Sequence, residues 1–283
     1  MTKGSQPTDG GNLLFSDSEK IAFVEQEPLA EKYIRPFLGS EEFINNIKRW
    51  CLWLENAAPS DLRKMPKVQE RLQAVKVMRL ASTKEATQKW ANFPSQFTEN
   101  RQSKSDYIVV PSVSSERRLY VPVGFMSANV ITSNLCLIIP KASKYHFAIM
   151  TSIMHNAWMR AVCGRLESRY RYSASIVYNN FPWPLNPTDK QKQTIETAAQ
   201  AVLDARAAHT ESSLADLYDP LTMPSNLLKA HQQLDKAVDA AYGKTKFANE
   251  AERVAFLFEL YQQYTTLIAP IEQAKPKKAR AKV

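Results

Sequence analysis

The chain changes character at residues 184–187 (Pro-Leu-Asn-Pro), and this change constrains the fold more than any other feature. Between residues 107 and 140, short β-branched or aromatic runs alternate with Ser, Pro, Gly and Asn, which is typical of strands. After Pro187 apolar residues recur at helical spacing and predict three helices. We therefore expect an α+β protein, in which a mixed β-sheet domain over about residues 31–186 precedes a small α-helical bundle domain over about residues 188–269. The predicted strands cover 107–110, 119–123 and 135–139, and the predicted helices cover 188–208, 224–242 and 249–268.

Local signals predict further elements. The polar residues 1–30 indicate a linker or an entering strand, and the run 49–54 indicates a buried strand. Pro66 begins a predicted helix that reaches about Trp90. Another helix is expected over 144–163, ended by Gly164, and its methionine and aromatic stripe indicates core packing. The last nine residues carry five Lys or Arg and no acid, so 270–283 is expected to be a basic disordered tail.

The cysteines and the apolar runs bear on the compartment. Cys51, Cys136 and Cys163 are far apart, odd in number and set in apolar runs, which indicates buried, reduced thiols and neither a disulfide framework nor a zinc site. No apolar stretch reaches the roughly 18 residues of a membrane span, and residues 1–11 lack the apolar core of a signal peptide. We expect a cytoplasmic protein without membrane contact.

Positive charge is concentrated in the predicted sheet domain. Residues 101–186 hold ten Lys or Arg and three Asp or Glu, a balance of +7, whereas residues 187–274 hold eight and twelve, a balance of −4. A basic domain beside a mildly acidic one is typical of a nucleic-acid reader with a separate docking module. Chance asymmetry is the alternative, because basic surfaces also occur on proteins that bind no polyanion.

The segment 164–173 (Gly-Arg-Leu-Glu-Ser-Arg-Tyr-Arg-Tyr-Ser) concentrates this charge. In an extended stretch side chains alternate between faces, so Glu167, Arg169 and Arg171 would project to the same side. The arginine fork matches guanine O6 and N7, and glutamate accepts from cytosine N4, so such an edge is able to read base pairs. The alternatives are a solvated charged loop, or an internal ion pair between Glu167 and Arg169 or Arg171.

The sequence lacks recognisable motifs for catalysis or cofactor binding. A methyltransferase needs a glycine-rich loop for S-adenosylmethionine and an Asn/Asp-Pro-Pro-aromatic motif for the flipped adenine, but none of the seven glycines forms such a loop. The stretch 180–183 (Asn-Phe-Pro-Trp) lacks the paired prolines and is assigned to packing. No nuclease cluster or P-loop is apparent, and the four histidines are isolated. We therefore predict no catalytic residue, no metal ligand and no cofactor site in this chain.

Several stretches together resemble the MmeI-like (type IIL) restriction–modification DNA adenine methyltransferases. They follow the family's order over about residues 5–268 and correspond to its target recognition domain and C-terminal helical domain. The resemblance implies that residues 1–30 are a linker or leader that follows a methyltransferase domain, so this chain looks like the back portion of a longer protein. The stretches that carry the resemblance are 34–45 (IRPFLGSEEFIN), 49–54 (RWCLWL), 114–118 (SSERR), 164–184 (GRLESRYRYSASIVYNNFPWP), 217–224 (LYDPLTMP) and 251–260 (AERVAFLFEL).

The resemblance also implies roles for individual residues. It implies sequence-specific binding of double-stranded DNA, next to an upstream methyltransferase domain or chain that would hold S-adenosylmethionine and carry out N6-adenine methylation. The alternative is a degenerate or helical protein-interaction module that does not read DNA. Matching motif to motif, the base-reading candidates are Ser112, Asn134, Leu135, Glu167, Arg169 and Arg171. The cations assigned to phosphates are Arg117, Arg118, Lys141, Lys144 and Arg165.

Overall fold

The computed structural model describes residues 1–244 and 246–268, and for residues 267 and 268 it describes the backbone alone. The predicted tail at 270–283 therefore lies outside the described residues. The described residues form three small sheets, with the orders β1-β9-β5-β7, β10-β11-β6 and β2-β4-β3-β8. The strands are β1 (Thr2–Lys3), β2 (Leu14–Ser16), β3 (Ile34–Leu38), β4 (Arg49–Leu52), β5 (Tyr107–Pro111), β6 (Val113–Ser114), β7 (Gly124–Met126), β8 (Ile131–Thr132), β9 (Cys136–Pro140), β10 (Gly164–Leu166) and β11 (Arg169–Arg171).

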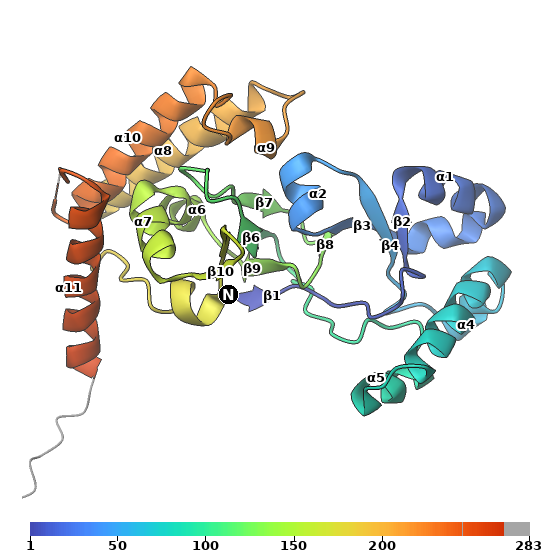
Figure 1. The fold of residues 1–283 in the computed structure, drawn as a ribbon. Coiled ribbons are helices and arrows are strands. Elements are labelled where there is room, and N and C mark those ends of the chain that lie inside the picture. Colours follow the sequence, from blue (N-terminus) through green and yellow to red (C-terminus); the bar gives the residue numbers. More distant parts are fainter. Residues whose placement is uncertain (245, 269–283) are drawn as a thin grey trace, which may run out of the picture.

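The helices flank these sheets (Figure 1). At one end of the molecule α1 lies beside β2 and β4, with α4 and α5 below it, and at the other end lie α8, α10 and α11. The helices are α1 (Asp17–Gln26), α2 (Ser40–Asn45), α3 (Pro59–Leu62), α4 (Pro66–Leu80), α5 (Glu85–Lys89), α6 (Lys144–Thr151), α7 (Ile153–Val162), α8 (Asp189–Ala207), α9 (Leu214–Leu217), α10 (Ser225–Ala241) and α11 (Glu250–Ile268), with a π-helical turn at Ala174–Tyr178.

In the central antiparallel sheet β1-β9-β5-β7, the inner strands β5 and β9 are buried on both faces. Because side chains alternate along a strand, Ile108 and Val110 of β5 enter a core shared with α6 and α7, whereas Tyr107 and Val109 pack with Phe43 of α2. β9 divides in the same way, so both strands are near-continuous apolar runs. The strands predicted at 107–110 and 135–139 are confirmed.

The second sheet, β2-β4-β3-β8, is mixed, because β3 pairs antiparallel with β4 and parallel with β8. Its own core joins Phe15, Cys51 and Leu52 to Val68 and Leu72 of α4. Residues 1–30 pack against both sheets: β1 pairs with β9 of the central sheet, and β2 pairs with β4 of the second sheet. The helix α1 begins with a Ser16–Glu19 capping box. The segment expected to be a linker or an entering strand is thus folded against the rest of the chain.

The C-terminal helices begin and end within a residue of the predicted positions. Thr188 caps α8, and the Oδ1 atom of Asn249 accepts from the amide of Glu252 at 2.9 Å at the start of α11. Ile195 of α8 and Leu234 of α10 belong to the same core as the helices on the central sheet. The predicted α+β class, a mixed-sheet region followed by a helical bundle, is confirmed. The domain boundaries stay predictions.

The predicted strand at 119–123 was wrong. Pro122 has no N–H to offer a neighbouring strand, and side chains of α7 and α8 bind the backbone on either side of it. The amide of Val121 donates to Oδ1 of Asn156 at 2.8 Å, and Arg206 donates to the carbonyl of Val123 at 2.7 Å. Residues 120–123 are buried as an irregular connection, and β7 begins only at Gly124.

Two predicted helices are interrupted. The helix expected over 66–90 ends at Leu80, and Arg79 then holds the returning chain by donating to carbonyls near both Pro7 and Trp90. The helix expected over 144–163 divides at Ser152, whose extended backbone caps α7. Of the three cysteines expected to be buried, Cys51 and Cys136 are buried and Cys163 is half-buried; all three are free thiols.

Candidate functional site

The charged segment 164–171 forms a hairpin and not one extended stretch. β10 and β11 pair antiparallel around a turn at Glu167 and Ser168, and β11 also pairs with β6. Glu167 has a positive φ of 56°, which few residues other than glycine adopt. Arg169 and Arg171 share the exposed face of β11, but Glu167 belongs to the turn. The expectation that all three project from one side of a single strand was wrong.

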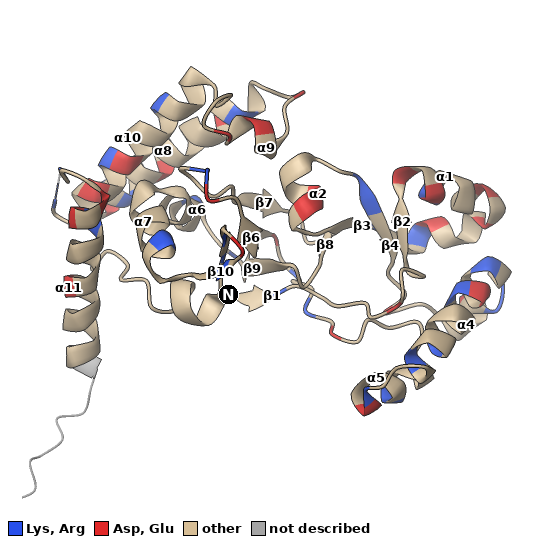
Figure 2. Cartoon of the chain, viewed as in Figure 1, with Lys and Arg blue, Asp and Glu red and all other residues tan. Residues whose placement is uncertain are grey.

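Glu167 nevertheless meets Arg169 at the tip of the hairpin. Nη2 of Arg169 donates to Oε2 of Glu167 at 2.8 Å. Both side chains are exposed and face outward, and Figure 2 shows positive and negative charge together on this hairpin. The ion pair expected as one alternative is therefore present in the free chain, and its polar atoms remain accessible to a ligand.

Ser112 links the hairpin to the central sheet. Its amide donates to the carbonyl of Leu135 at 3.1 Å, and its carbonyl accepts from the amide of Tyr172 at 2.9 Å. Val113 is the register partner of Arg171. Backbone bonds thus bring together Ser112, Leu135 and Arg171, which lie far apart in the sequence.

Asn134 and Leu135 occupy the turn between β8 and β9. The amide of Asn134 donates to the carbonyl of Ser5 at 2.9 Å, and its Nδ2 atom donates to Oε1 of Gln6 at 3.4 Å. The Leu135 side chain is 62% exposed although the strand it precedes is buried. Ser40 fixes this turn from the other side by donating to the Leu135 carbonyl at 2.6 Å. The turn therefore presents the side-chain amide of Asn134 and the exposed side chain of Leu135 on a backbone that hydrogen bonds hold in place.

The root of the hairpin is anchored in the core. The Tyr172 hydroxyl and the Nε2 atom of His155 on α7 form a hydrogen bond of 2.9 Å, and both residues are buried. Burial lowers the pKa of His155 to about 3, so this imidazole is neutral near pH 7. His155 is buried in the core, where its ring packs against Phe181.

Three of the predicted cations lie at or near the hairpin. The guanidinium of Arg165 stacks on the Tyr170 ring, 4.1 Å from its centroid, and donates to the Ser168 carbonyl. Arg118 is half-buried beside β6, and burial lowers its pKa. Arg117 is exposed, with Nη2 3.7 Å from a carboxylate oxygen of Asp219. Arg165 is the cation best held in an accessible position.

Lys141 and Lys144 lie elsewhere. Pro111 faces Cys136 at one end of the β5–β9 ladder, and Tyr107 faces Pro140 at the other. Leu135 therefore precedes the end near the hairpin, whereas Lys141 follows the opposite end, roughly 15–20 Å away at about 3.3 Å per residue. Both lysines are exposed, but the structure does not gather them with the base-reading candidates.

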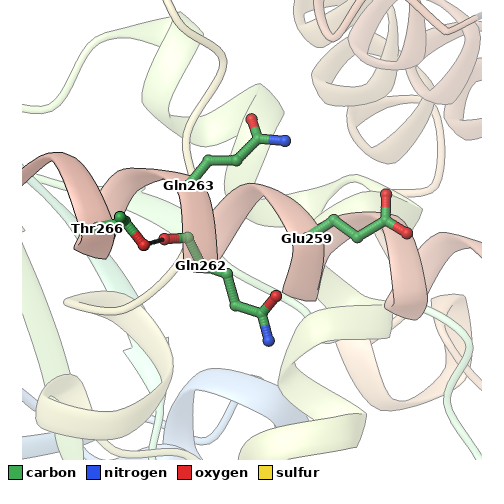
Figure 3. Close-up of a pocket in the computed structure, with 4 residues that line it drawn as sticks. All are labelled: Glu259, Gln262, Gln263 and Thr266. Carbon is green, nitrogen blue, oxygen red and sulfur yellow. Dashed lines mark hydrogen bonds between the residues drawn. The ribbon is translucent and has the colours of Figure 1, made fainter.

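A hollow along α11 is lined by Glu259, Gln262, Gln263 and Thr266 (Figure 3), and these four residues include no cation. Within residues 1–244 and 246–268, no group of three or more His, Cys, Asp or Glu is placed to hold a metal ion. In the same part of the chain, no helix combines the length and apolar character needed to cross a membrane.

Comparisons with known proteins cover nearly the whole chain. The family model for the MmeI target recognition domain matches residues 1–185, and that for the MmeI C-terminal domain matches residues 187–269. DNA methyltransferase A of Bacillus subtilis (strain 168) is 42% identical over 262 residues, which are 93% of this chain and 30% of that protein. A solved structure of the type IIL restriction-modification enzyme MmeI in complex with DNA is 52% identical, with a TM-score of 0.91 over 94% of this chain and 35% of that one. The chain thus spans about a third of the length of these relatives.

Proposed function

The chain belongs to the MmeI family, and from this premise we propose that it recognises a specific sequence in duplex DNA for a restriction–modification enzyme. The family resemblance expected from the sequence motifs is confirmed by the two domain matches. The observation that carries the proposal is the neighbourhood of the predicted readers. Ser112, Leu135 and Arg171 are joined through backbone bonds, and Asn134 and the Glu167–Arg169 pair adjoin them.

Each of these side chains has a base partner that suits its chemistry. Arg169 and Arg171 carry the fork that pairs with guanine O6 and N7, and Glu167 accepts from cytosine N4. The Asn134 amide matches adenine N6 and N7, Leu135 suits a thymine methyl, and Ser112 pairs with either kind of group. Because their backbone is held by β-ladders and turns, little ordering is required on binding, which favours specific readout.

Phosphate contacts would position the duplex without specifying its sequence. We assign this role first to Arg165, Arg117 and Arg118, which lie at or near the hairpin. Lys141 and Lys144 contact the same duplex only if its backbone continues along the central sheet to the far end of β9. The helical region 188–269 is proposed to support the reader, and not to read bases itself.

Methyl transfer is assigned to other parts of the enzyme. The two family models that match this chain describe a target recognition domain and a C-terminal domain. We propose that an N6-adenine methyltransferase portion, with its S-adenosylmethionine and an associated nuclease portion, acts on DNA that this chain positions. The chain by itself is then expected to bind no S-adenosylmethionine, and calorimetry that detects micromolar binding would contradict this.

Salt-dependent DNA binding by the 283-residue chain tests the proposal. If four to eight phosphates are neutralised, log K is expected to fall against log[salt] with a slope of about −4 to −7. Sequences bound from a randomised duplex pool at low salt are expected to share preferred bases. A chain that binds no duplex at low salt, or binds all duplexes equally, would instead support the protein-interaction alternative.

A further inference from the structure

We propose that Gln6 is a positioning residue that orients the Asn134 amide for base recognition. The contact joins the start of the chain to the turn before β9: Nδ2 of Asn134 donates to Oε1 of Gln6 at 3.4 Å. This role rests on the proposed function, because it assumes that Asn134 meets a base. Gln6 itself belongs to none of the sets of residues assigned to bases or phosphates above.

The backbones of both residues are fixed by the same close approach. Ser5 and Ser133 form a parallel bridge, and the Asn134 amide donates to the Ser5 carbonyl at 2.9 Å. Gly4 is required here, since a Cβ atom at this position would lie 2.3 Å from the carbonyl oxygen of Ser133. The absence of a side chain at Gly4 therefore lets residues 5 and 6 lie directly against residues 133 and 134.

The chain is also held on the other side of Gln6. Its backbone exchanges hydrogen bonds with Glu99, at 2.9 Å and 3.2 Å. The carbonyls of Pro7 and Thr8 accept from the buried guanidinium of Arg79 at 2.8 Å and 2.9 Å. Gln6 thus projects its side chain from a segment that is fixed before and after it, which is the condition for orienting a neighbour.

The chemistry of the asparagine amide makes such orientation useful. Its nitrogen carries two hydrogens and its oxygen is an acceptor. If one hydrogen is donated to Gln6, the second hydrogen and Oδ1 remain, and these are the donor and acceptor that adenine N7 and N6 require. An unheld amide turns between two orientations that exchange donor and acceptor, so it distinguishes adenine less well. At 3.4 Å the bond is long, so its loss should change the free energy of unfolding little.

Three variants of the 283-residue chain separate this role from packing. Gln6→Met has a similar length without an acceptor, Gln6→Glu keeps the acceptor, and Asn134→Ala removes the proposed reader. Bound sequences are compared from a randomised duplex pool at low salt, with thermal unfolding as the check of folding. Gln6→Ala replaces Gln6→Met if the methionine lowers the Tm.

The expected pattern is specific to one base position. Asn134→Ala should abolish the preference for adenine there, and Gln6→Met should weaken it by about three- to tenfold, part of the discrimination of a bidentate contact. Gln6→Glu should retain most of the preference, although added negative charge lowers affinity for every sequence. Adding Gln6→Met to Asn134→Ala should change nothing further, because Gln6 acts through Asn134.

The outcomes distinguish the role of Asn134 from that of Gln6. If Asn134→Ala leaves every preference unchanged, Asn134 is not a reader, and both its assigned role and that of Gln6 are overturned. If Asn134→Ala acts but Gln6→Met changes no position, or weakens all positions equally, the reading function stands and the positioning role of Gln6 is wrong.

Discussion

The carboxylate of Glu167 accepts a hydrogen bond from Nη2 of Arg169 at 2.8 Å across the tip of the β10–β11 hairpin. The two side chains are 77% and 46% exposed. An ion pair this accessible contributes only about 0–1 kcal/mol to stability. Little is therefore lost when its donor and acceptor exchange partners, and they remain available to a base pair.

Removing this charge pair is expected to affect recognition and not folding. Glu167→Gln should change the free energy of unfolding by less than about 1 kcal/mol, while altering the base preferred at one position. The matched control is Glu85→Gln on α5, which breaks the similarly exposed Lys89–Glu85 pair and should leave DNA preference unchanged. Chemical denaturation and selection from a duplex pool measure the two effects. Equal changes of preference in both variants would argue against a specific role for Glu167.

Among the cations of the N-terminal half, Arg79 is expected to be the one whose substitution lowers the free energy of unfolding most. It is fully buried and donates to the carbonyls of Pro7, Thr8, Trp90, Phe93 and Gln96 at 2.8–3.0 Å. Lysine has three donors on one atom and does not replace the five-donor fork. Because each buried acceptor left unpaired costs about 1–3 kcal/mol, Arg79→Lys should lower the free energy of unfolding by roughly 2–4 kcal/mol.

A surface substitution provides the comparison for Arg79. Arg63 is exposed, so Arg63→Lys should change the unfolding free energy by less than about 0.5 kcal/mol. Urea denaturation of both variants measures the difference. An Arg79→Lys chain as stable as Arg63→Lys would show that the five carbonyls find other donors.

Asp235 makes a pH-dependent contribution to folding stability where α10 contacts the rest of the core. Burial raises its pKa to about 6, although the Ile153 amide and the Tyr120 hydroxyl donate to it and oppose the shift. Because the folded state holds the proton of Asp235 more tightly than the unfolded state, this proton stabilises the fold. The stabilisation is complete below the unfolded-state pKa, near 3.9, and is lost as the pH rises through 6. Between pH 4 and pH 7, the free energy of unfolding of the wild type should therefore fall by up to about 3 kcal/mol relative to that of Asp235→Asn, at 1.36 kcal/mol per pKa unit.

The comparison with Asp235→Asn removes the opposing effect of other groups. Burial lowers the pKa of both His155 and His231, so these residues destabilise the fold as the pH falls, but they do so in both proteins. Unfolding free energies at several pH values give the difference curve. A flat curve would mean that Asp235 stays ionised in the folded chain.

Arg165 is expected to contact phosphate and not a base. Arg165→Gln should weaken binding to all sequences about equally and reduce the magnitude of the salt slope by about 1. The control is Lys192→Gln on α8, which removes an exposed cation from the helical region. Fluorescence titrations at several salt concentrations measure both slopes. A change in the preferred bases on Arg165→Gln would move this residue from positioning to reading.

Local signals explain why some elements were predictable. Alternating faces and apolar composition predict β5 and β9, and the cap at Thr188 predicts the start of α8, because neighbours in sequence determine these features. The hairpin was missed since its turn has Glu167 in a left-handed conformation without the Asn-Gly or Asp-Gly pair that predicts such turns. The run 119–123 was misassigned because side chains of distant helices bind its backbone.

The candidate site was predictable in its residues and not in its assembly. The resemblance named Ser112, Asn134 and the hairpin residues, and their roles at DNA stay predictions. The backbone bonds through Ser112 that gather them involve partners far apart in the chain, which no local pattern reveals. Gln6 was missed for the same reason: it lies 128 residues from Asn134, in a segment whose polarity indicated a linker or an entering strand.

The most direct test exchanges the two charges at the hairpin tip. If Glu167 accepts from cytosine N4 while Arg169 donates to the guanine opposite, the pair specifies C·G, with about 1–3 kcal/mol of discrimination. Glu167→Lys combined with Arg169→Asp keeps an ion pair but reverses donor and acceptor along the base-pair edge. Sequences bound from a randomised duplex pool are expected to invert from C·G to G·C at one position, with the others unchanged. Wild type and double variant selecting the same base at every position would contradict the account.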